Sequence, residues 1–170
     1  MSIRLMAHNP QWKQEFDQSR STLLQATEGW FTDIQHIGST AIPGIVAQPV
    51  IDMLAGMEDM QGLNEVAELV EGLNYSRQAA PVWCLDELAA WLQKPRSGEQ
   101  THSLLIVRRD GPAWQRCLAI REQLNENLVA RQQLESLKRD HFQPGCAAEQ
   151  QYEQAKAEFF AELQARFGES

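Results

Sequence analysis

The feature that most constrains this chain is the segment at residues 35–52, QHIGSTAIPGIVAQPVID. The residues Phe31–Ile37, in which apolar and polar side chains alternate only roughly, predict a strand that ends in a turn made of Gly38, Ser39 and Thr40. A glycine lets the backbone turn tightly and approach a ligand, and neighbouring amides and hydroxyl groups can hold phosphate oxygens. We therefore predict a phosphate-binding turn. The alternative is a plain strand-to-helix turn in which Ser39 or Thr40 is the helix cap.

A second apolar run at residues 50–55 predicts another strand, which carries a single acid, Asp52. A carboxylate inside an apolar strand is costly to bury unless it is paired, hydrogen-bonded or bound to a metal. Magnesium usually takes one or two carboxylates together with waters and substrate phosphates. We therefore predict that Asp52 is the catalytic residue and a ligand of Mg²⁺. The alternative is a structural salt bridge between Asp52 and a nearby arginine.

Two histidines lie close to these strands in the sequence. His36 comes two residues before Gly38, and His102 opens a further predicted strand, THSLLIV. Imidazole is a common metal ligand, although a single histidine more often has a structural role. His36 and His102 are therefore candidate metal ligands that would act together with Asp52.

The charge of the chain restricts its partners. The formal net charge is -8, and nucleic-acid binding draws on a broad basic surface, so we expect no nucleic-acid partner. Between Arg108 and Asp140, however, seven basic residues stand against five acidic ones. This region could accept one small anionic ligand. Arg121, Lys138 and Lys156 are the candidate basic contacts, and solvated helix faces are the alternative.

The composition predicts one soluble domain. A chain of 170 residues with 43% hydrophobic and 22% charged residues can bury a single core. No apolar run reaches the roughly 20 residues of a membrane helix, so no membrane partner is expected. The three cysteines form no CxxC pair, which suits a reducing cytoplasm. Cys146 near His141 remains a minor option for a thiol nucleophile, since no flanking signature supports it.

The order of predicted elements indicates an α+β fold in which helices pack on a small mixed β-sheet. We expect one domain over residues 1–170, with a helical portion from about residue 111. A helix should begin near Asn9-Pro10 and end near Thr27. The other predicted elements are a short helix or loop at 40–46, a helix at 63–73, weak strands at 75–77 and 81–85, a single turn at 89–91, a loop at 94–100, a strand at 101–107, a helix capped by Asp110, and helices at 128–142 and 147–167.

Several stretches resemble one protein family. HIGSTAIPGIVAQPVIDML is similar to the signature of the GrpB-like proteins, a bacterial group within the nucleotidyltransferase superfamily. AHNPQWKQEF, THSLLIV, LKRDHF and YEQAKAEFF resemble other parts of the same family pattern. The resemblance covers nearly the whole chain and implies a nucleotidyltransferase-like fold.

The resemblance also implies roles for particular residues. In the superfamily the Gly-Ser turn contacts nucleotide phosphates, and acidic strand residues hold one or two magnesium ions. A bound hydroxyl then attacks the α-phosphate, aided by charge stabilisation and alignment. By this resemblance Gly38 and Ser39 would contact phosphate and Asp52 would bind the metal. The expected partner is a small-molecule nucleotide or another phosphorylated ligand.

The chain departs from the superfamily pattern at several positions. Leu54 stands where a second acid is usual, and the strand at 101–107 has no third carboxylate. Ser103 and Leu105 occupy places where the family typically has histidines. Two hypotheses follow: a metal-assisted nucleotidyltransferase acting on a small molecule, or a nucleotide- or anion-binding module that has lost catalysis. A third is a metal-dependent enzyme that uses His36, Asp52 and His102 on a substrate other than a nucleotide.

Overall fold

The computed structural model describes residues 5–80 and 87–141, with only the backbone described at 138–141. The strand expected at 81–85 and the helix expected at 147–167 lie outside this part of the chain. So do Lys156 and Cys146. Within the described residues, no helix combines the length and the apolar character needed to cross a membrane.

The described chain contains four α-helices, five strands and two short 3₁₀ turns. They are α1 (Gln11–Thr27), β1 (Phe31–Ile37), η1 (Ser39–Ala41), β2 (Ile51–Met57), η2 (Met60–Gly62), α2 (Leu63–Glu71), β3 (Ser76–Gln78), β4 (Ala90–Lys94), β5 (His102–Arg108), α3 (Pro112–Glu126) and α4 (Leu128–His141).

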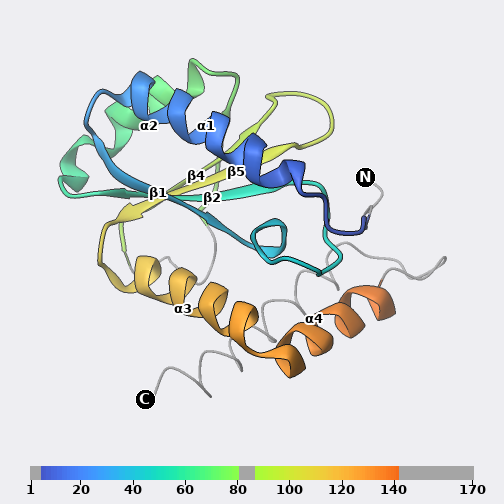
Figure 1. The fold of residues 1–170 in the computed structure, drawn as a ribbon. Helices are drawn as coiled ribbons and strands as arrows, with labels where there is room; N and C mark the ends of the chain where they lie inside the picture. Colours follow the sequence, from blue (N-terminus) through green and yellow to red (C-terminus); the bar gives the residue numbers. More distant parts are fainter. Residues whose placement is uncertain (1–4, 81–86, 142–170) are drawn as a thin grey trace.

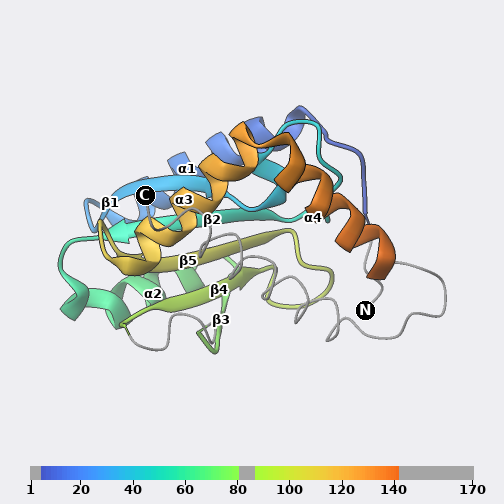
Figure 2. The same ribbon diagram turned by 90° about the horizontal axis from the view of Figure 1, so that it is seen from below.

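The five strands form one mixed sheet in the order β1-β2-β5-β4-β3. β2 and β5 run parallel, and the other neighbouring pairs are antiparallel. Helices α1 and α2 cover one face of the sheet, and α3 lies against the other (Figure 1). Figure 2 shows α3 crossing the second face, with α4 continuing from it toward the end of the sheet. The predicted α+β fold with a small mixed sheet is therefore confirmed.

Each face of the sheet has its own apolar core, because side chains alternate along a strand. Ile51 and Met53 of β2 pack in the core that contains Trp12 and Phe16 of α1. Leu54, one residue further on, packs in a second core beneath α3. Asp52 has the same parity as Leu54, so β2 presents its carboxylate to the α3 face.

Two local predictions were wrong. Residues 90–94 form the strand β4, not a single turn followed by a loop, because they pair with both β3 and β5. Asp110 does not cap α3, since it adopts a left-handed conformation with φ 63° and the helix N-cap is Gly111. Instead, Oε1 of Glu87 accepts a hydrogen bond of 2.8 Å from the backbone amide of Ala113, in the first turn. Contacts with segments distant in the sequence therefore accompany both features: pairing with β3 and β5 at residues 90–94, and the Glu87 side chain at the start of α3.

Candidate functional site

The turn after β1 requires glycine for two reasons. Gly38 has φ 73° and ψ -173°, a backbone conformation that side chains strongly disfavour. A Cβ atom built on Gly38 would lie only 2.4 Å from Oδ2 of Asp52. Ile37 and Asp52 are direct partners in the β1–β2 ladder, which brings the turn and the carboxylate together. The first two elements of the predicted site, the Gly-Ser turn and the acid, are therefore in contact.

Thr40 holds the turn from inside the protein. Its side chain is 3% exposed, and its hydroxyl donates to the carbonyl of Val50 over 3.2 Å. Nε2 of His36 lies 2.8 Å from the same hydroxyl oxygen. Because the single hydroxyl proton goes to Val50, the imidazole Nε2–H is the donor in this contact. Thr40 was predicted to contact a ligand, but the structure turns its hydroxyl inward, where it joins the turn to β1 and β2.

His36 points to the α1 face, away from Asp52. Its ring stacks on Phe16 of α1, with centroids 4.8 Å apart and planes 13° from parallel. Burial, and then the positive charge of Arg121, lower the pKa of His36 to about 4. His36 is therefore neutral near pH 7 and acts as a hydrogen-bond donor that fixes Thr40.

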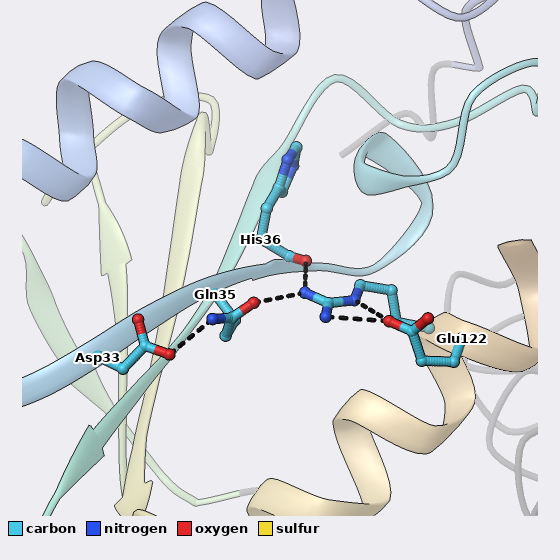
Figure 3. A network of polar contacts seen from close by, with 5 residues as sticks. Asp33, Gln35, His36 and Glu122 are labelled. Atoms are coloured by element: carbon cyan, nitrogen blue, oxygen red, sulfur yellow. Dashed lines mark hydrogen bonds and ion pairs between the residues drawn. The ribbon is translucent and has the colours of Figure 1, made fainter.

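Arg121 joins α3 to β1 close to the turn. Its Nη1 donates to Oε1 of Gln35 over 2.8 Å and to the carbonyl of His36 over 3.1 Å (Figure 3). Its Nε and Nη2 both donate to Oε1 of Glu122, and Gln35 in turn donates to Asp33. The side chain is 20% exposed. Arg121 thus connects α3 to β1 near the turn. Its role as a ligand contact stays a prediction.

The loop that follows the turn is fixed by the C-terminal helices. Ile42 and Ile45 are at most 1% exposed and pack with Leu124 and Leu134. The backbone amide of Val46 donates to Oε1 of Glu135 in α4 over 3.1 Å. Sequence reasoning missed this docking. The isoleucines three residues apart were the available signal.

The face of the sheet around Asp52 is mostly apolar. Leu54 is 0% and Leu105 is 5% exposed, and both pack with Trp114 of α3. Ser103 is the direct partner of Asp52 on β5, and its hydroxyl accepts a hydrogen bond of 2.8 Å from Nε1 of Trp91. Leu54, Ser103 and Leu105, where the resemblance implied further polar ligands, are therefore on the same face as Asp52, and none of them carries a carboxylate or an imidazole.

The three predicted metal ligands do not come together. His36 and His102 have Met53 and Ile51 as their partners on β2, so they share the α1 face, whereas Asp52 is on the α3 face. Among the described residues, no group of three histidine, cysteine or acidic side chains is placed to hold a metal ion. A site built from His36, Asp52 and His102 is thus ruled out by the alternation of the strands.

The remaining predicted basic contacts are not placed in detail. Lys138 lies in α4, where only the backbone is described, and Lys156 lies outside the described residues. Neither position tests the expectation that these lysines approach an anionic ligand.

Comparison with known proteins identifies relatives along almost the whole chain. A family model described as GrpB protein matches residues 2–166. A "Glutamate-rich protein GrpB" from Alkalihalophilus pseudofirmus is 30% identical over 162 residues, covering 95% of this chain and 93% of the relative. The crystal structure of a conserved protein GrpB from Enterococcus faecalis superposes with a TM-score of 0.83 at 24% identity and covers 96% of each chain.

A more distant structural likeness extends to nucleotidyltransferases. The Cid1 poly(U) polymerase, solved with magnesium and 3′-dATP bound, matches with a TM-score of 0.51 and 10% identity. The match covers 77% of this chain and 40% of the polymerase, and it concerns the fold alone. With the family model spanning nearly every residue, the chain belongs to the GrpB family.

Proposed function

We propose that this protein binds a small phosphorylated ligand of the nucleotide class at the Gly38–Ser39 turn, together with one magnesium ion held by Asp52. The observation that carries the proposal is the contact between Gly38 and the Asp52 carboxylate. A turn able to approach phosphate oxygens and an acid able to bind a cation thus occupy the same end of the β1–β2 pair.

The turn is accessible, and hydrogen bonds anchor it on two sides. Gly38, Ser39 and Asp52 are each partly exposed, whereas Thr40 behind them is buried. His36 and Thr40 hold the turn from the α1 side, and α4 holds the loop that follows it. Because the backbone is fixed before the ligand arrives, little ordering entropy opposes binding.

The donor set fits one magnesium ion. Magnesium is commonly bound by one or two carboxylates, with waters and ligand phosphates completing its octahedral shell. Asp52 supplies one carboxylate, and the phosphates of the ligand would supply further oxygens. When bound, the ion would neutralise part of the phosphate charge. On β2 and β5 the neighbouring positions of this face, Leu54, Ser103 and Leu105, carry no second acid, which favours binding over two-metal chemistry.

Nucleotidyl transfer is the second candidate function. By the resemblance of the sequence, Asp52 would correspond to the first acid of the superfamily pattern, and the fold is similar to that of a poly(U) polymerase solved with magnesium and 3′-dATP. With one carboxylate, any rate enhancement would come chiefly from alignment at the turn and from charge stabilisation.

Titration calorimetry with nucleoside mono-, di- and triphosphates and coenzyme A, with and without Mg²⁺, tests the proposal. We expect at least one nucleotide to bind more tightly with Mg²⁺, and Asp52→Asn to remove the effect of the metal. Ser39→Ala should weaken nucleotide binding by about tenfold or more, since one hydrogen bond to a charged group is lost. Glu58→Gln removes one charge just beyond the other end of β2 and is the matched control.

The outcomes separate the candidates. Nucleotide binding that is indifferent to Mg²⁺ and to Asp52→Asn would leave the turn as an anion site and remove the metal from the proposal. Failure of all these ligands to bind would overturn both candidates. Transfer is tested with nucleoside triphosphates labelled at the α-phosphate. A labelled product that forms in the wild type and disappears in Asp52→Asn would establish an enzyme.

A further inference from the structure

A cavity of about 360 Å³ lies on the α1 face of the sheet, opposite to the face that carries Asp52. One wall is formed by α1, which contributes Glu15 and Ser19 at helical spacing. The other wall contains Lys94 at the end of β4 and His102 at the start of β5, which are direct partners in the sheet. The volume is within the range of about 300–1,000 Å³ that is typical of small-molecule sites.

The cavity contains two opposite charges that are not paired with each other. Within the described residues, no ion pair joins the Glu15 carboxylate to the Lys94 ammonium group, although both line the cavity. Nζ of Lys94 instead lies 5.8 Å from the centre of the Tyr75 ring. A side-chain ammonium group and a carboxylate facing a shared space favour an occupant with both charges.

The other titratable groups of the cavity are neutral near pH 7. Burial, and then the charge of Lys94, lower the pKa of His102 to about 4. Burial raises the pKa of Tyr75 to about 12. The net charge of the cavity wall is therefore the sum of Glu15 and Lys94, which is zero. A ligand that is only an anion or only a cation would leave one of these charges unmatched.

We propose that this cavity binds a small zwitterion of the α-amino-acid kind. Its ammonium group would face Glu15 and its carboxylate would face Lys94, with Ser19 as a further hydrogen-bonding group. Leu23 and Leu73 also line the cavity and provide an apolar surface for the side chain of the ligand. This site is separate from the proposed nucleotide site, because the sheet lies between them.

His102 provides a direct probe of occupancy. The imidazole signals of ¹⁵N-histidine-labelled protein are followed by NMR during titration with the twenty L-amino acids. The corresponding amines and carboxylates, which carry one charge each, are titrated in parallel, and His102→Gln assigns the signal. We expect at least one amino acid to shift the His102 signal saturably and to bind about tenfold more tightly than its single-charge analogues.

Three variants complete the test. Glu15→Gln and Lys94→Met should each weaken amino-acid binding by about tenfold, because each removes one charge partner and keeps the side-chain length. Lys13→Met removes a lysine of α1 that does not line the cavity and should leave binding unchanged. The proposal is overturned if no amino acid shifts the signal at millimolar concentration. It is also overturned if single-charge analogues bind as tightly as the amino acid, or if the Glu15 and Lys94 variants bind the amino acid as tightly as the wild type does. Nucleotide titrations report on the other face, so the two proposals can fail independently.

Discussion

A methyl group on the α-carbon of Gly38 would lie only 2.4 Å from Oδ2 of Asp52. The contact joins the residue that follows β1 to the second residue of β2. It explains why the position requires glycine even apart from its positive φ.

Replacement of Gly38 by alanine should destabilise the fold strongly. Strain at φ 73° together with the clash against Asp52 should lower the free energy of unfolding by about 2–4 kcal/mol. Gly44→Ala is the matched control, since Gly44 has φ 80° but no atom within 4 Å of the added methyl group. It should cost about 1 kcal/mol. Urea denaturation measures both, and equal losses would mean that the Asp52 contact contributes nothing.

The inward hydroxyl of Thr40 predicts a structural effect. Thr40→Val keeps the shape but leaves the Val50 carbonyl and the His36 Nε2–H without their partner, which should cost about 1–3 kcal/mol. Thr40→Ser keeps the hydroxyl and should cost less. Thermal denaturation of the two variants compares them. A Val variant as stable as the wild type would show that these hydrogen bonds are not stabilising.

The depressed pKa values of His36 and His102 predict a loss of stability in acid. Both titrate near pH 4 in the folded protein, compared with an ordinary value of 6.5. Between these values the unfolded chain binds protons that the folded chain does not, so stability falls as the pH is lowered from 6.5 through 4. Above pH 6.5 both histidines are neutral in the folded and in the unfolded chain, so none of this stability is lost.

The size of this effect can be measured one histidine at a time. His36→Gln retains an amide that can donate to Thr40, and it should reduce the acid-induced loss by about 1–3 kcal/mol. Urea midpoints at several pH values between 7.5 and 4 provide the comparison. NMR titration of the His36 imidazole gives the folded pKa directly, and a value near 6.5 would contradict the proposed burial effect.

Arg121 should stabilise the contact between α3 and β1. Arg121→Met removes the hydrogen bonds to Gln35 and to the carbonyl of His36 and should cost about 1–3 kcal/mol. Arg77→Met is the control, because Arg77 makes one exposed contact with Asn64 and should cost at most about 1 kcal/mol. Hydrogen exchange should also become faster in β1. Unchanged exchange there would show that α3 is held by its apolar contacts alone.

The sequence predicted strands well where a nearby turn residue marked the end of the strand. β1 has the bounds that its rough alternation and the following glycine predicted. β4 was missed because its alternation is short, with Ala90 and Leu92 buried and Trp91 between them. Only its pairing with strands on both sides makes that segment extended.

The errors about the site have a different origin. His36 was a candidate to bind a metal ion together with Asp52, but the antiparallel register pairs His36 with Met53 and places its ring on the other face. The contact of Arg121 with Gln35 joins residues 86 positions apart, and the docking of Val46 on Glu135 spans 89. Such contacts depend on strand register and helix packing, which one sequence does not display.

The parallel pairing of β2 with β5 has a consequence for genetics. Successive side chains of a strand point to opposite faces of the sheet. Since residues 51 and 52 pair with residues 102 and 103, the two strands alternate in step. Substitutions at neighbouring positions of one strand should therefore fall into two classes, one that disturbs the core beneath α1 and one that disturbs the core beneath α3. Two defective alleles, one altered on each side of the sheet, are expected to show distinct phenotypes although the mutated codons are adjacent.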